Sequence, residues 1–213
     1  MSKASARNRP VVVFDLGGVL IDWDPRHLYR KLFDQDTAME RFLDEVCHGA
    51  WNLEQDRGRS FAEAIREATL RHPDQRAMIE AYHLRWEEML AGAIEDTVTI
   101  LEELRDAGCE LHALTNWSAE TFPHARARFA FLEHFETILV SGEERLIKPD
   151  PDIFALLLER IGHPAQACIF IDDSTRNVAG AAALGFDAIR FENPRQLRAE
   201  LVRRGLLDGA ERA

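Results

Sequence analysis

Four places in the chain carry side chains that could act together on an anionic group. They are Asp15, the Thr115–Asn116 pair, Lys148 and the adjacent acids Asp172 and Asp173. A carboxylate can attack an electrophilic phosphorus or carbon atom. Two carboxylates and a backbone carbonyl supply the oxygen ligands that Mg²⁺ prefers. A hydroxyl can hold the transferred group, and an ammonium can neutralise the added negative charge of a transition state.

Apolar runs typical of buried strands precede each of these side chains. Val11–Phe14 runs directly into Asp15, and similar runs at 110–114, 137–140 and 167–171 precede the other three. Short uninterrupted apolar runs indicate strands covered on both faces. Because the carboxyl ends of parallel strands lie at one edge of a sheet, we expect the polar side chains to converge there.

Segments with helical spacing alternate with these runs. Residues 151–161 carry one apolar stripe that stops at Gly162, and an alanine-rich helix is expected over 174–184. A last strand over 187–191 and a final helix over 194–204 complete the pattern. Strands that alternate with helices of this length indicate an α/β fold with a parallel, doubly wound sheet.

The stretch between the first and second strands has no convincing strand pattern. Ser60 and Glu63 form a capping box that predicts the start of a helix. A longer helix is expected from Asp74 through Leu90. We therefore expect two domains. A core domain comprises residues 1–23 and 93–213, and an inserted all-helical domain comprises residues 24–92.

The ordered set of motifs resembles the haloacid dehalogenase superfamily of aspartate-nucleophile hydrolases. The motifs are FDLGGVL, LTN, KPDPDIF and FIDDSTRNVAGA, and the resemblance extends from Val11 to about Phe191. It implies a Rossmann-like core with five or six parallel strands. It also implies that the helical insert is a cap domain, which closes over the site and sets substrate specificity.

The resemblance implies roles for the candidate catalytic residues. Asp15 would be the nucleophile, Thr115 would bind the phosphate, and Lys148 would hold the nucleophile and the substrate anion. Asn116 is a further candidate for substrate binding. Trp51, which lies between two expected helices of the insert, is another because that segment could face the catalytic edge.

The resemblance also implies a metal site for Mg²⁺. Its ligands would be Asp15, Asp172 and the backbone carbonyl of Gly17. Asp173 would support the metal through water. We therefore expect Mg²⁺ as the cofactor and a small phosphate monoester as the substrate.

The chain departs from most phosphatases of the superfamily at Gly17. Those phosphatases carry a second Asp at this position, and it protonates the leaving group. General acid catalysis is worth about 10²–10⁴-fold, so its loss matters for a poor leaving group. The acid could instead come from Asp22, Asp24 or a residue of the cap. The substrate could also have a leaving group that needs no proton.

Two alternatives to a phosphatase follow from this departure. In a 2-haloacid dehalogenase Asp15 would attack carbon, and the halide would leave without a proton. The adjacent acids Asp172 and Asp173 favour Mg²⁺ and a phosphoryl group, because they would repel the carboxylate of a 2-haloacid. The second alternative is a non-catalytic binding protein on the same fold, and the intact set of candidate catalytic residues argues against it.

Composition narrows the possible partners. The formal net charge of −11 over 213 residues argues against nucleic acid, and no apolar stretch is long enough to cross a membrane. Residues 1–10 lack the apolar segment of a secretory signal, so we expect a loose, basic tail there. Three cysteines without a CxxC motif indicate a reducing cytoplasm and no structural disulfide.

Overall fold

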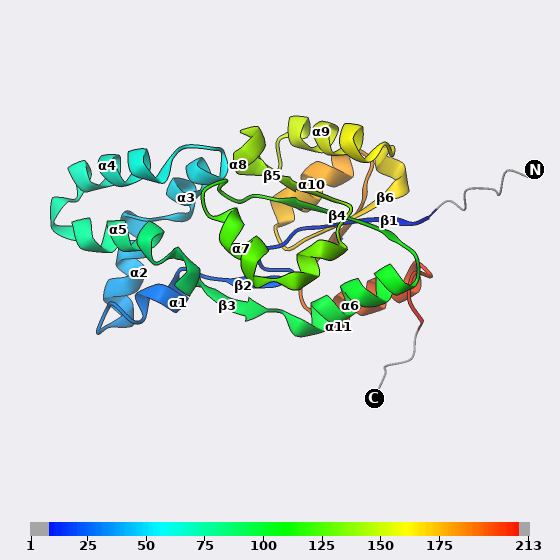
Figure 1. Ribbon diagram of the computed structural model, residues 1–213, viewed down its shortest axis with the longest axis horizontal. Coiled ribbons are helices and arrows are strands. Elements are labelled where there is room, and N and C mark those ends of the chain that lie inside the picture. The colour runs from blue at the N-terminus through cyan, green and yellow to red at the C-terminus, as the bar shows by residue number, and fades with distance from the viewer. Residues whose placement is uncertain (1–8, 209–213) are drawn as a thin grey trace, which may run out of the picture.

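A five-stranded parallel sheet forms the centre of the molecule, with strand order β5–β4–β1–β6–β7 (Figure 1). The computed structural model describes residues 9–208, so most of the predicted N-terminal tail lies outside the described residues. The predicted parallel, doubly wound sheet is confirmed. Its strands are β1 (Val11–Phe14), β4 (Glu110–Thr115), β5 (Thr137–Val140), β6 (Cys168–Asp172) and β7 (Asp187–Arg190).

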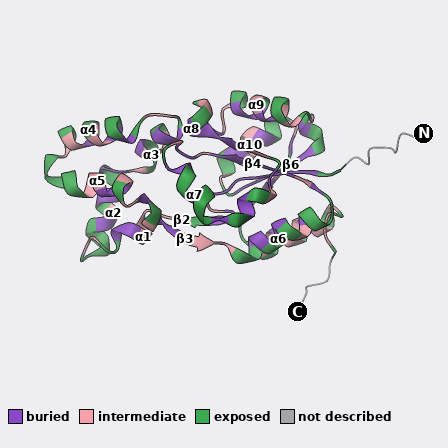
Figure 2. Cartoon of the chain, in the orientation of Figure 1, coloured by how far each residue is buried: buried purple, intermediate pink, exposed green. Residues whose placement is uncertain are grey.

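Side chains of β1 alternate between two buried clusters, one on each face of the sheet. Val11 and Val13 pack with residues of α9 and α10, and Val12 and Phe14 pack with residues of α6 and α11. Figure 2 shows β4 and β6 largely buried and the outer faces of α6 and α9 exposed. The helices are α6 (Glu95–Asp106), α9 (Pro151–Ile161), α10 (Thr175–Ala183) and α11 (Pro194–Arg203).

Short helical segments connect the remaining strands. Two of them, α7 and α8, follow β4 and β5 and so lie near the carboxyl ends of the sheet strands. Figure 1 shows α7 and α8 on the side of the sheet that faces the insert. The segments are α7 (Phe122–Arg128), α8 (Ser141–Glu144) and the 3₁₀ helices Ala130–His134 and Ala165–Ala167.

Helical segments fill the insert, and α2 to α5 extend away from one end of the sheet (Figure 1). The predicted helix start at Ser60 is confirmed, because its hydroxyl accepts a hydrogen bond from the Glu63 N–H at 3.2 Å and caps α4. The segments are α1 (Arg26–Tyr29), α2 (Asp36–Glu45), α3 (Gly49–Asp56), α4 (Phe61–Arg71), α5 (Arg76–Leu84) and the 3₁₀ helices Pro73–Gln75 and Trp86–Met89.

The prediction of one helix through Leu90 is wrong. The helix α5 ends at Leu84, and β3 (Leu90–Ala93) pairs in antiparallel fashion with β2 (Ile21–Trp23). Gly92 weakens a helix at this point. The backbone of Leu90–Ala93 instead pairs with a segment far away in sequence, which local periodicity does not reveal. The two strands form a ribbon where the chain enters and leaves the insert.

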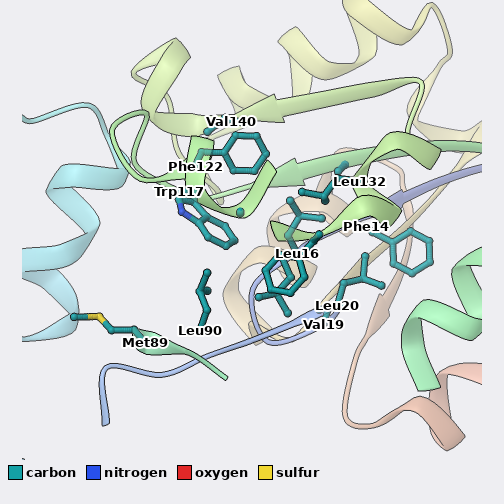
Figure 3. Packing of buried hydrophobic residues seen from close by; sticks show 14 of the residues in the cluster. Phe14, Leu16, Val19, Leu20, Met89, Leu90, Trp117, Phe122, Leu132 and Val140 are labelled. Carbon is teal, nitrogen blue, oxygen red and sulfur yellow. The ribbon is translucent and has the colours of Figure 1, made fainter. Parts of the chain in front are cut away.

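One buried cluster connects the sheet to the insert. It includes Phe14 and Leu16 near the end of β1, Trp117 after β4, and Met89 and Leu90 where the insert ends. Figure 3 shows part of it, from Phe14 at the sheet to Met89 beside the insert. The insert therefore packs against the edge of the sheet where the polar side chains are predicted to meet.

The structure also bears on two further expectations, which concern the cysteines and membrane-spanning helices. Cys47, Cys109 and Cys168 are free, as the absence of a CxxC motif predicts. Over residues 9–208, no helix is long and apolar enough to cross a membrane.

Candidate active site

Asp15 lies immediately after β1 and is 7% exposed. Its backbone N–H donates to the Ile171 carbonyl at 2.8 Å, which continues the pairing of β1 with β6. Gly18 follows with φ of +74°, and a Cβ there would lie 2.6 Å from Asp173 Oδ2. The positive φ favours glycine at 18, and a side chain there would displace the Asp173 carboxylate.

Lys148 joins three strand ends through its ammonium. The Nζ atom lies 2.9 Å from Asp15 Oδ2 and 2.7 Å from Asp172 Oδ2. It also donates to the Leu114 carbonyl at 2.8 Å. The structure thus brings together three of the predicted site residues, Asp15, Lys148 and Asp172, at the edge of the sheet that the strand pattern indicates.

Asn116 holds the loop that carries Lys148. Its Nδ2 donates to the Lys148 carbonyl at 3.0 Å, and its Oδ1 accepts from the Lys148 N–H at 2.8 Å. Both ends of the amide are therefore engaged with the backbone of that loop. Thr115, the last residue of β4, is 1% exposed next to it. The proposed substrate contacts of these two residues remain predictions.

Asp172 is held from three sides. Besides Lys148, the Ser174 N–H donates to its Oδ1 at 2.8 Å. Asn177, on α10, directs its Nδ2 to both carboxylate oxygens, at 3.0 and 3.1 Å. Sequence reasoning missed Asn177, although it lies within the FIDDSTRNVAGA motif. Its position in the helix that follows Asp172 is the signal that could have identified it.

Three carboxylates lie close together, and two of them, Asp15 and Asp172, contact the Lys148 ammonium. One oxygen from each of Asp15, Asp172 and Asp173 lies within 4.8 Å of the others. Burial, and secondarily Asp172, raises the pKa of Asp15 against the opposing effect of Lys148. Burial and Asp172 also raise the pKa of Asp173. Crowded carboxylates of this kind fit a divalent cation with oxygen ligands, because a cation would offset the excess negative charge.

Lys148 stays charged in this setting. Burial alone would lower its pKa, but Asp15 and Asp172 raise it and the net shift is upward. A permanent positive charge beside Asp15 can hold an anionic group that approaches this carboxylate.

A cavity lies between the insert and the edge of the sheet where the strands end. Gly17 and Asn116 line it from the core, and Asn52 and Asp56 line it from α3. The rest of its wall combines large aromatic rings with two hydroxyl side chains, namely Trp23, Phe61, Trp86, Trp117, Ser118 and Thr121. The wall therefore offers both apolar surface and hydrogen-bonding groups next to the predicted nucleophile.

The prediction that Trp51 lies between two helices is wrong, because Trp51 is part of α3 and its ring packs in the aromatic core of the insert. It is 4% exposed, and its ring lies 5.0 Å from that of Tyr82 and 6.4 Å from that of Phe61. Its neighbour Asn52 and the more distant Asp56 line the cavity instead. The proposed substrate contact of Trp51 remains a prediction.

Asp56 is a buried carboxyl that sequence reasoning did not identify. Asn52 Nδ2 donates to its Oδ2 at 3.1 Å. Burial raises its pKa to about 7, against the smaller opposing effects of a backbone hydrogen bond from Ser118 and the charge of Lys148. The sequence pattern places this segment between two helices, so no local signal marks Asp56 as a buried acid.

Most of the chain matches one known protein family. A family model described as haloacid dehalogenase-like hydrolase matches residues 10–185. The chain belongs to this family. It is a hydrolase, as the resemblance implied.

Relatives of this haloacid dehalogenase-like hydrolase include both phosphatases and dehalogenases. This chain is 24% identical to sesquiterpene phosphatase astK of Aspergillus oryzae, over 81% of its own length and 85% of that protein. It is 27% identical to (S)-2-haloacid dehalogenase 4A of Burkholderia cepacia, over 46% of the chain and 43% of that protein. Two longer curated relatives are matched over only 19% and 35% of their length.

A solved structure similar to this hydrolase contains both magnesium and phosphate. It is a haloacid dehalogenase family enzyme from Bacteroides thetaiotaomicron in complex with magnesium and inorganic phosphate. The two chains are 25% identical, with a TM-score of 0.65 over 87% of this chain and 95% of the other. The similarity agrees with the Rossmann-like arrangement of the sheet.

Gly17 faces open space in this haloacid dehalogenase-like hydrolase. A Cβ built on Gly17 would meet no described atom within 4 Å. The residue also lines the cavity. Glycine is therefore not required here by close packing, and the absence of a carboxyl at 17 leaves that side of the cavity without an acid.

Proposed function

We propose that the protein is a Mg²⁺-dependent phosphatase that hydrolyses a small-molecule phosphate monoester through an aspartyl-phosphate on Asp15. The observation that carries this proposal is the cluster of Asp15, Asp172 and Asp173 around one buried Lys148. Such a cluster suits a cation and a phosphoryl dianion. The three carboxylates would repel the carboxylate of a 2-haloacid, because no metal ion would offset the negative charges in that reaction.

The metal would be held by Asp15, Asp172 and the backbone carbonyl of Gly17, with Asp173 acting through water. When bound, Mg²⁺ would neutralise charge on the phosphoryl oxygens and on the acidic cluster. The network around Asp172 supports this assignment, because Ser174 and Asn177 fix the orientation of its carboxylate.

The chain's own residues would carry out the displacement. One Oδ of Asp15 would attack phosphorus, with the carboxylate oriented by Lys148 and by the Leu16 N–H, which donates to Asp15 Oδ1 at 2.7 Å. The Lys148 ammonium would hold the phosphoryl oxygens as negative charge builds up on them. Thr115 would contribute its hydroxyl to the same phosphoryl group. Water would then release phosphate from Asp15.

We further propose a division of labour between two domains. Residues 1–23 and 93–213 form the core that binds phosphate and metal, and residues 24–92 form a cap that encloses the leaving group. Closure of such a cap would exclude water and bring specificity residues to the substrate. Free, buried cysteines favour a reducing compartment, so we place the enzyme in the cytoplasm.

The test is hydrolysis of p-nitrophenyl phosphate with Mg²⁺ and with EDTA, and Asp15→Asn is the matched variant. We expect phosphate release that needs Mg²⁺ and is lost in Asp15→Asn while the fold is retained. Halide release from 2-chloropropionate is measured in parallel. Metal-independent halide release without phosphatase activity would establish the dehalogenase alternative and refute the phosphatase.

A further inference from the structure

We propose that Asp56, a residue of the helical insert, protonates the leaving group in place of the acid that Gly17 lacks. This inference rests on the proposed phosphatase function and assigns a further catalytic residue to it. The proton would reach the active site from the insert rather than from the loop after β1.

The position of Asp56 is the first support. It is the last residue of α3, and it lines the same cavity as Gly17 and Asn116, which follow closely after Asp15 and Thr115. A leaving group that occupies this cavity would lie beside both the Asp56 carboxyl and Gly17, which is two residues after the predicted nucleophile. Only 9% of Asp56 is exposed, so bulk water has little access to it.

The contacts of Asp56 fix its orientation. Asn52 Nδ2 donates to Oδ2 at 3.1 Å. The Ser141 hydroxyl donates to the Asp56 backbone carbonyl at 2.6 Å. The first contact holds the side chain, and the second ties the end of α3 to the first residue of α8, directly after β5.

The charge environment suits a proton donor. Among the described residues, no salt bridge pairs Asp56 with a Lys, Arg or His. The charge of Lys148 in the core lowers the pKa of Asp56, and Asp56 in turn raises the pKa of Tyr82 on α5. Burial raises its pKa to about 7, so a substantial fraction of the carboxyl holds its proton near neutral pH.

The proton inventory balances over the two chemical steps. Asp15 forms a bond to phosphorus as the bond from phosphorus to the ester oxygen breaks. The electron pair of the broken bond stays on that oxygen, which takes the proton from Asp56 and leaves as an alcohol. Water then attacks phosphorus and gives a proton to the Asp56 carboxylate. Phosphate departs, and both carboxyl groups return to their starting states.

The experiment compares two phosphate esters of similar size and opposite leaving-group quality. Benzyl phosphate releases a strongly basic alkoxide, and p-nitrophenyl phosphate releases a weakly basic phenolate. In Asp56→Asn we expect kcat for benzyl phosphate to fall about 10²–10⁴-fold, and kcat for p-nitrophenyl phosphate to fall less than about tenfold. The control is Glu54→Gln, which changes an exposed acid on the same helix and should leave both rates unchanged.

A rescue variant uses the open space at Gly17. We expect Gly17→Asp, combined with Asp56→Asn, to restore benzyl phosphate hydrolysis at least about tenfold, because an acid then reaches the same cavity from the core. If Asp56→Asn does not fold, the wild-type pH profile gives the same test. The ratio of the benzyl to the p-nitrophenyl rate should fall above about pH 7, as Asp56 loses its proton.

The rates on the two phosphate esters distinguish a failure of the role of Asp56 from a failure of the proposed phosphatase function. Equal losses on both esters in Asp56→Asn would mean that Asp56 only supports the structure, and would overturn its catalytic role. A wild-type protein that hydrolyses p-nitrophenyl phosphate but not benzyl phosphate would also overturn it. A wild-type protein that hydrolyses neither ester would overturn the phosphatase itself.

Discussion

Lys148 and Asp172 form an ion pair in which neither side chain has any exposed surface, with Nζ 2.7 Å from Oδ2. Asp15 approaches the same ammonium at 2.9 Å. Desolvation makes such a pair costly to bury, yet removing one partner is costlier still, because an uncompensated charge then remains inside the protein. The proposed active site is therefore also a sensitive point for stability.

Replacing this ammonium should weaken the fold. Lys148→Met leaves Asp15 and Asp172 buried without their shared cation, so we expect the free energy of unfolding to fall by about 3–5 kcal/mol. Urea unfolding monitored by circular dichroism measures the loss. Lys31→Met, which breaks a half-exposed pair with Glu88, should cost less than about 1 kcal/mol. Equal losses in the two variants would contradict this account.

Magnesium should stabilise the folded protein. A ligand that binds only the folded state at 100 times its dissociation constant adds about 2.7 kcal/mol to the free energy of unfolding. We expect Mg²⁺ to raise the melting temperature of the wild type, and EDTA to reverse the increase. Asp172→Asn should show little response, because it lacks a proposed ligand. A melting temperature of the wild type that does not respond to Mg²⁺ would refute the metal assignment.

Asn177 should affect magnesium through Asp172. Asn177→Ala removes the amide that lies 3.0 and 3.1 Å from the two carboxylate oxygens. Loss of such a supporting contact weakens metal binding about 10–100-fold, because the ligand is no longer held in orientation. Titration of activity with Mg²⁺ measures the apparent affinity. Asn193→Ala, which removes a cap from the distant helix α11, is the control, and an equal effect there would count against the assignment.

Asp56 should make stability depend on pH. Its pKa is about 7 in the folded protein and 3.8 ordinarily. Between these values the folded state binds more protons than the unfolded state, so the free energy of unfolding falls as pH rises. Asp56→Asn lacks this contribution to the pH dependence of the free energy of unfolding. Its stability relative to the wild type should therefore increase between about pH 4 and pH 7, by on the order of 2–4 kcal/mol.

Urea unfolding at a series of pH values measures this difference. Glu54→Gln again supplies the control, since that side chain is exposed on the same helix. A difference between Asp56→Asn and the wild type that stays constant over the pH range would show that the Asp56 carboxyl is not buried in the manner described.

The sheet and the convergence of Asp15, Lys148 and Asp172 were predictable because both follow from local patterns. The strand Thr137–Val140 and the helix Pro151–Ile161 have the predicted bounds, since continuous apolar runs and a glycine stop are readable in short windows. The place of the polar side chains then follows from the rule that parallel strands end at one edge.

The parts that sequence did not reveal depend on contacts between distant segments. Asp56 reaches the cavity next to Gly17 only because α3 packs against α8, which follows β5. The strand Leu90–Ala93 forms only because Ile21–Trp23 lies beside it. No local periodicity contains that information, and the proximity of Asn116 to the Lys148 loop is hidden for the same reason.

The ribbon of β2 and β3 also bears on how the enzyme could be altered. Trp23 pairs with Leu90, and the Asp24 N–H donates to the Met89 carbonyl at 3.0 Å, so both connections to the insert leave from one point. Segments whose ends lie side by side are good candidates for exchange between proteins. Transplanting the insert of a relative at this point should change substrate preference while Asp15, Lys148 and Asp172 keep their arrangement. In such a chimera the insert would also have to bring its own acid.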